Sequence, residues 1–213
     1  MTADTLFNRI TNRAVKRLAD TMLRGRLSYL GGDTALVLVG TQPDLLADAA
    51  VLARLVRLKA AARTAALPVV YTPALSPTPE NGIHNPTPSQ RALVESKLLR
   101  PGTAGADIHP DLAPGMDDIV MKPCPALSAF AGAALAEQLV ALGAERIVLA
   151  GARTDVEVDS TARDAVELDM QTTIVSNCCV GTSPANHSAS IATTLPRMVH
   201  SVVTLDDLIE RLR

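Results

Sequence analysis

With 213 residues, the chain is long enough to form one domain that buries a full hydrophobic core without disulfides or metals. Hydrophobic residues make up 47% of it, yet only two Phe, two Tyr and no Trp are present, which argues against the aromatic platform on which single-stranded nucleic acid stacks. A formal net charge of -2 gives no electrostatic reason to expect a nucleic-acid partner. No apolar run approaches the ~18 residues of a membrane span, so we expect no membrane partner.

The chain has three cysteines, Cys124, Cys178 and Cys179. An odd number with two adjacent residues is a poor disulfide framework, so the sequence predicts a reducing compartment and a cytoplasmic location.

Residues 1–30 differ from the rest of the chain in their pattern and are expected to form an N-terminal amphipathic helical extension of a domain spanning 31–213. Apolar residues recur there at helical spacing, at Phe7, Ile10, Ala14, Leu18 and Met22. Arginines and a lysine lie mostly off this stripe, a pattern that fits a transit peptide, a surface-binding helix, or a helix packed on the domain or a neighbouring subunit. Asp4 and Asp20 interrupt the basic face and favour the packed helix.

Apolar runs typical of buried strands alternate with helical patterns from residue 35 onward. The expected strands are residues 35–39, 69–71, 118–121, 146–150, 172–176 and 198–203. The expected helices are residues 43–65, 90–99, 131–142, 156–168, 185–195 and 205–212. This alternation predicts an α/β protein with a mostly parallel sheet, right-handed crossovers and helices on both faces. Ligands bind such sheets beyond the carboxyl ends of the strands, which directs attention to Gly40, Thr72, Lys122, Gly151 and Asn177.

The connection over residues 72–117 is unusually long and rich in Pro, Gly, Ser and Thr. Loops of this length are uncommon unless they bind or cover something, so we interpret it as a lid or as a subunit-contact arm.

Three segments resemble the isochorismatase-like (cysteine hydrolase) family, and the resemblance runs from about Asp33 to the C-terminus. The first is Ala35-Leu-Val-Leu-Val-Gly-Thr-Gln42, similar to the first strand of that family, which usually ends in an Asp two residues before a Gln. The second is Ile119-Val-Met-Lys122, similar to its lysine strand, with Ser128-Ala-Phe130 following. The third contains Thr154-Asp155-Val156 and Thr161-Ala-Arg-Asp-Ala at the spacing of the family's nucleophile turn. The resemblance implies a three-layer α/β/α, Rossmann-like fold with strand order 3-2-1-4-5-6, and a homodimer or larger homo-oligomer.

The family's cysteine enzymes use an Asp as general base, a supporting Lys and a Cys nucleophile. Carried over by position, these fall on Gly40, Lys122 and Glu157. Glycine cannot transfer a proton, and a carboxylate is a weak nucleophile toward amides. The isochorismatase branch dispenses with the Cys but keeps the Asp, so Gly40 conflicts with that branch as well. We therefore expect no enzymatic hydrolysis of nicotinamide, simple amides or isochorismate.

Neither a cofactor nor a metal is expected. Nicotinamidase-like relatives carry an Asp-x-His and a further His after the second strand, and the corresponding segment here has no such pair. The four histidines, His84, His109, His187 and His200, are scattered, although the long connection could bring His84 over the site.

Two interpretations of Glu157 remain open. In the first, its carboxylate lies at a helix N-terminus within salt-bridge reach of Lys122, beside space vacated at Gly40, and acts as a base or holds a cationic group. In the second, it forms a stabilising ion pair in a pocket that has lost activity.

We therefore expect a protein that acts on a small organic molecule, such as a secondary-metabolite intermediate, by acid–base chemistry through Lys122 and Glu157. One alternative is an inactive small-molecule-binding or protein-interaction module, and a weaker one is an amide hydrolase using Cys124. The expected substrate-binding residues are Gly40, Gln42, Cys124, Arg153 and Thr154.

Overall fold

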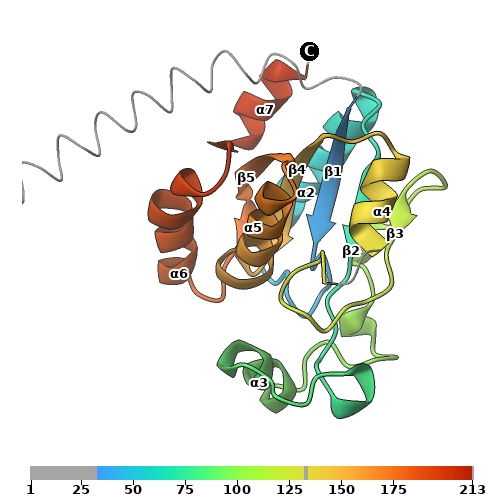
Figure 1. Ribbon diagram of the computed structural model, residues 1–213, viewed down its shortest axis with the longest axis vertical. Coiled ribbons are helices and arrows are strands. Elements are labelled where there is room, and N and C mark those ends of the chain that lie inside the picture. The colour runs from blue at the N-terminus through green and yellow to red at the C-terminus, as the bar shows by residue number, and fades with distance from the viewer. Residues whose placement is uncertain (1–32, 132–133, 213) are drawn as a thin grey trace, which may run out of the picture.

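The computed structural model describes residues 33–131 and 134–212 and shows a three-layer α/β/α domain (Figure 1). Its six strands form one sheet in the order β3-β2-β1-β4-β5-β6, and every neighbouring pair is parallel. The predicted fold class and strand order are thus confirmed. The strands are β1 (Thr34–Val39), β2 (Val69–Thr72), β3 (Ile119–Val120), β4 (Arg146–Ala152), β5 (Gln171–Val180) and β6 (Ser201–Val203).

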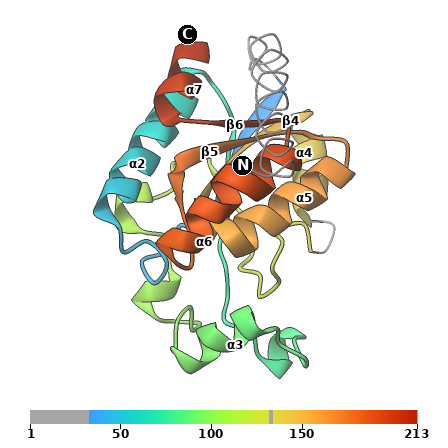
Figure 2. The same ribbon diagram turned by 90° about the vertical axis from the view of Figure 1, so that its left-hand side faces the viewer.

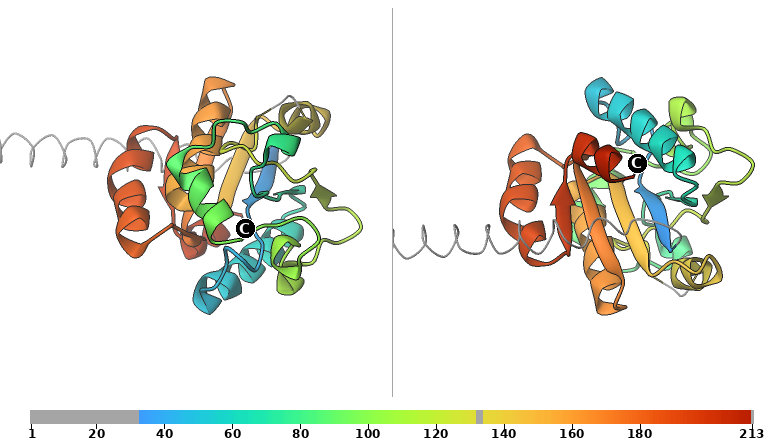
Figure 3. Two further views of the ribbon diagram at one scale, coloured as in Figure 1. Left: turned by 90° about the horizontal axis from the view of Figure 1, so that it is seen from below. Right: turned by 90° about the horizontal axis from the view of Figure 1, so that it is seen from above.

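Helices cover both faces of the sheet, with α2 and α7 on one face and α4 and α5 on the other (Figure 3). The α-helices are α2 (Ala49–Thr64), α3 (Pro88–Glu95), α4 (Ala134–Ala141), α5 (Asp159–Glu167), α6 (Pro184–Ala189) and α7 (Leu205–Arg211). The core lies between these layers and is aliphatic, and all six residues of the central strand β1 are buried. Burial on both faces explains why β1 reads as a continuous apolar run.

Several element boundaries differ from the sequence predictions. The helix expected from residue 43 begins only at Ala49, because Asp48 caps it by accepting hydrogen bonds from the amides of Ala50 and Val51. The helix expected over 156–168 begins with a π-helical turn, Thr154–Val158, before α5. The helix expected over 185–195 is divided into α6, a second π-helical turn and a short 3-10 helix.

The long connection forms an arm beyond the carboxyl ends of the strands, and α3 is its main helix (Figures 1 and 2). The helix predicted over 90–99 is α3, which begins earlier because Thr87 and Gln90 form a capping box. The connection is held to the domain by a polar cluster in which the Lys59 ammonium lies 3.3 Å from the Asp118 carboxylate and donates to the carbonyls of Leu112 and Ala113.

The predicted extension, residues 1–30, lies outside the described residues. Within residues 33–131 and 134–212, every helix is too short or too polar to cross a bilayer.

Candidate functional site

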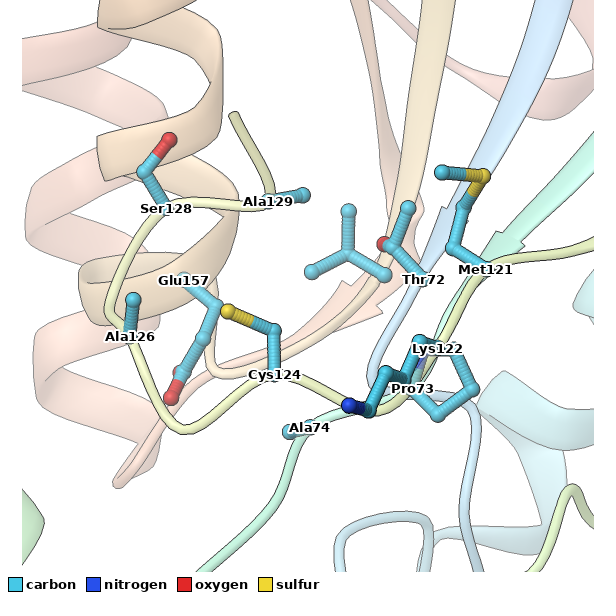
Figure 4. Close-up of a pocket in the computed structure, with 11 residues that line it drawn as sticks. Thr72, Pro73, Ala74, Met121, Lys122, Cys124, Ala126, Ser128, Ala129 and Glu157 are labelled. Carbon is cyan, nitrogen blue, oxygen red and sulfur yellow. The ribbon is translucent and has the colours of Figure 1, made fainter. Parts of the chain in front are cut away.

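A pocket lies at the carboxyl ends of β1, β2 and β3 (Figure 4). Much of its wall is apolar and comes from Val39, Pro73, Ala74, Met121, Ala126 and Ala129. The polar groups in the wall are the side chains of Thr72, Lys122, Cys124, Ser128 and Glu157. The pocket therefore lies where the rule for parallel sheets places a ligand.

The turn that follows β4 depends on a close approach between two strands. Gly151 has a φ of +135°, and a Cβ at this position would overlap the carbonyl oxygen of Val39 in β1. Only glycine fits this contact, which coincides with a register irregularity between β4 and β5. Arg153, two residues later, also has a positive φ of 57° and precedes the π-helical turn that carries Glu157.

Glu157 is 5% exposed, and its carboxylate is paired with Arg153. Arg153 Nε donates to one carboxylate oxygen at 2.6 Å, and Nη2 contacts the other. The guanidinium is 7% exposed as well, and its Nη1 donates to Ser89 Oγ of α3 at 3.2 Å. Burial lowers the pKa of Arg153 to about 10, and nearby Asp155 opposes this shift, so Arg153 remains charged at neutral pH. The pair is thus a buried arginine–carboxylate ion pair joined by one hydrogen bond and a second close contact.

The predicted ion pair between Glu157 and Lys122 is wrong. The two side chains line the same pocket from opposite sides, with Cys124 between them (Figure 4). Among the described residues the carboxylate of Glu157 forms its ion pair with Arg153, which lies four residues earlier, one helical turn away, and not with Lys122. Lys122 is solvent-exposed, and within the described chain its ammonium has no hydrogen-bond or ion-pair partner.

The expected vacancy at Gly40 is also wrong. Gly40 is buried with a φ of +58° and is not part of the pocket wall. A Cβ there would lie 3.2 Å from Leu45 Cδ1 and 3.6 Å from the Ala152 carbonyl oxygen. A side chain here would contact Leu45 and Ala152, and because Gly40 does not border the pocket it adds no space on the side of Glu157.

Two of the proposed substrate-binding residues have structural partners instead. The Gln42 amide is fully buried and binds the backbone of the arm, donating to the carbonyls of Ala74 and Ala106 at 2.8 and 2.7 Å and accepting from the Ala74 amide at 2.7 Å. Thr154 is also fully buried, and its hydroxyl lies 2.9 Å from His187 Nδ1. Neither residue lines the pocket. They hold the arm and the turn that form two of its sides.

The cysteines differ in their access to the pocket. Cys124 is half-buried in the pocket wall, where the segment after β3 forms backbone hydrogen bonds with Pro73 and Leu75. Cys178 and Cys179 lie within β5 and are buried. Burial raises the pKa of both buried thiols to about 12, which makes their thiolates scarce at neutral pH.

Sequence reasoning missed two parts of the site. Arg153 was identified as a substrate-binding candidate, but its pairing with Glu157 was not, although the i,i+4 spacing of an Arg and a Glu is a readable signal. No sequence signal connects Ser89 of the distant arm to Arg153. His84 is exposed and does not line the pocket. Across residues 33–131 and 134–212, no three His, Cys, Asp or Glu side chains gather as ligands for a metal ion.

This architecture defines an α/β protein with a pocket at the carboxyl edge of a parallel sheet. A family model described as the isochorismatase domain matches residues 34–207, and the chain belongs to the isochorismatase family. It is 36% identical over 84 residues to YecD, an uncharacterised isochorismatase family protein of Escherichia coli O157:H7, an alignment that covers 39% of this chain and 44% of that protein.

Solved structures share the fold along most of the chain. A cysteine hydrolase from Pseudomonas syringae pv. phaseolicola 1448A superposes with a TM-score of 0.72 at 22% identity and covers 84% of this chain and 92% of its own. An isochorismatase family protein from Desulfovibrio vulgaris subsp. vulgaris str. Hildenborough gives the same TM-score and identity, with coverages of 85% and 99%.

Proposed function

We propose that this chain binds a small organic acid in the pocket and that the Lys122 ammonium holds the carboxylate of that ligand. The supporting observation is the distribution of charge around the pocket. Glu157 is neutralised by Arg153, whereas Lys122 lines the pocket without an ionic partner among the described residues. A pocket with mainly apolar walls and one uncompensated ammonium favours a ligand with an apolar body and one negative charge.

Covalent hydrolysis of the cysteine type is not part of this proposal. The position that carries the family's nucleophile holds Glu157, and Arg153 contacts both of its carboxylate oxygens. A carboxylate held in this way is a weak nucleophile toward amides. Gly40 has no side chain to replace the family's Asp as a proton carrier.

A second candidate is acid–base turnover of the bound molecule with Lys122 as the acid. It is favoured by the position of Lys122 facing the Cys124 thiol and Glu157 across one pocket (Figure 4). General acid–base help is typically worth ~10²–10⁴-fold in rate. The same position of Cys124 supports a cysteine-dependent variant of this reaction, which thiol chemistry distinguishes.

The test is a titration with three ligands of matched shape, namely benzoate, benzamide and benzylammonium. We expect benzoate to bind more tightly than the other two, and Lys122→Met to abolish that preference. Lys97→Met is the matched control, since Lys97 is an exposed lysine of the arm outside the pocket wall. A benzoate preference that survives Lys122→Met would contradict the proposal.

Turnover is assayed in the same samples by following ammonia release from benzamide. We expect none above the uncatalysed rate. Hydrolysis that is lost on iodoacetamide treatment or in Cys124→Ser would instead establish the cysteine-dependent reaction.

A further inference from the structure

We propose that Arg153 is the residue that sets the charge preference of the pocket, because it cancels the charge of Glu157 and so makes Lys122 the dominant charge. This inference rests on the proposed function and extends it from the residue that holds the ligand to the residue that selects it. Arg153 acts through Glu157 and does not itself line the pocket.

The first step of the argument is the burial of the pair. The side chain of Arg153 is 9% exposed and that of Glu157 is 6% exposed, so solvent screens neither charge effectively. Each charge is therefore felt strongly in the adjoining pocket unless the other cancels it. The ion pair brings the opposite charges together and leaves the pair nearly neutral as seen by a ligand.

The second step is how the charge of the pair acts on a ligand in the pocket. Glu157 is part of the pocket wall together with Lys122, so an unbalanced carboxylate there would oppose the attraction of Lys122 for an anion. Two unit charges ~7 Å apart at an effective dielectric constant of ~20 interact by an amount worth more than tenfold in affinity. The partner of Glu157 thus decides whether the pocket favours an anion.

The third step is how Arg153 is held in place. Its positive φ directs the backbone into the turn, and its Nη1 donates to Ser89 Oγ on α3. The nearby Gln90 amide donates to the Pro125 carbonyl at 2.9 Å, so α3 contacts both Arg153 and the pocket-lining segment. The arm fixes the guanidinium from the side opposite Glu157 and prevents it from turning away to solvent.

The test measures the ratio of benzoate to benzamide affinity at pH 8 for four variants compared with the wild type. We expect Arg153→Met to lower the ratio roughly tenfold and Glu157→Gln to raise it by a similar factor, since each leaves one charge unbalanced. The double variant Arg153→Met/Glu157→Gln and the charge-conserving Arg153→Lys should both remain within about threefold of the wild type.

The double variant also guards against misfolding, because it contains no unpaired buried charge. Equal ratios in the wild type, Glu157→Gln and Arg153→Met, each shown to be folded by its NMR spectrum, would overturn the inference while leaving the proposed function intact. A benzoate preference that is absent in the wild type, or independent of Lys122, would instead overturn the proposed function itself. A double variant that behaves like Arg153→Met would show that packing and not charge is responsible, which also contradicts the inference.

Discussion

We expect the substitution Asp118→Asn to destabilise the domain more than an Asp→Asn substitution at an exposed position. The Asp118 side chain is 5% exposed and contacts Lys59, which is 8% exposed, and Arg63, which is half-exposed. It also accepts a hydrogen bond from the Gly115 amide at 2.8 Å. The cluster joins α2 to the end of the long connection, just before β3.

The magnitude follows from what remains after the substitution. Lys59 keeps the carbonyls of Leu112 and Ala113 and its position 5.3 Å from the Tyr71 ring centroid, but its buried charge loses the only carboxylate that the structure places within 4 Å of it among the described residues. Removing one partner of a buried ion pair typically costs roughly 3–5 kcal/mol. In a domain of this size, that loss lowers the melting temperature by roughly 6–20 °C.

The pH dependence provides an independent check. Burial alone would raise the pKa of Asp118, but the Gly115 amide, Lys59 and Arg63 outweigh it and hold this pKa below its usual value. A lowered pKa in the folded state means that the contribution of Asp118 is complete above its unfolded pKa of ~3.9 and is lost as the pH falls through the folded value. The stability difference between wild type and Asp118→Asn should therefore narrow below about pH 4.

Chemical denaturation followed by circular dichroism measures the free energy of unfolding, with Asp117→Asn as the control because Asp117 is the adjacent, exposed aspartate. The double variant Lys59→Met/Asp118→Leu removes both charges and should recover most of the loss, since apolar replacements of buried pairs are often neutral. If Asp118→Asn and Asp117→Asn unfold at the same denaturant concentration, the cluster does not anchor the connection as described.

Two further predictions concern the strand ends. Gly151→Ala places a Cβ against the Val39 carbonyl oxygen, so we expect a loss of several kcal/mol in unfolding free energy or an insoluble protein. An unchanged melting temperature would show instead that β1 and β4 can separate at this point. At pH 8 iodoacetamide should modify Cys124 first and leave Cys178 and Cys179 unmodified until the protein unfolds, because burial raises the pKa of both buried thiols to about 12. Peptide mapping by mass spectrometry measures the order of modification, and modification of Cys178 or Cys179 before Cys124 would contradict the prediction.

The sheet was readable from the sequence because its central strands, β1, β2 and β4, are buried on both faces. A run such as residues 35–39 has no polar residue to interrupt it, so both its type and its central place follow from hydrophobicity. Helix starts were less readable, because the cap at Asp48 competes with the equally plausible Pro43 start. The π-helical turn before α5 leaves no pattern distinct from that of an α-helix, so its position comes only from tertiary contacts.

The site could be predicted only in part. The motifs indicate which residues lie at the pocket, but they do not indicate which of those side chains contact one another. The motifs placed Lys122 and Glu157 at one pocket, and the structure does the same. They led to the wrong partner for Glu157, since a search between distant segments overlooked an arginine four residues away. The Gly40 inference failed for a different reason: the size of a missing side chain does not reveal whether neighbouring atoms fill its place.

The Arg153–Glu157 pair explains how a buried glutamate can be accommodated at the position where the sequence resemblance implies a nucleophile. An isolated carboxylate at this burial would be costly, and it would be expected to take up a proton or to move toward solvent. With Arg153 one turn earlier, the charge of Glu157 is balanced by an ion pair, and the guanidinium gains a further contact on the arm at Ser89. Two residues of one turn therefore compensate each other, whereas Gly40 and Lys122 take no part in the compensation. For this reason the substitution Glu157→Cys alone would leave the buried Arg153 unpaired. A variant designed to restore a cysteine nucleophile would therefore have to change Arg153 as well.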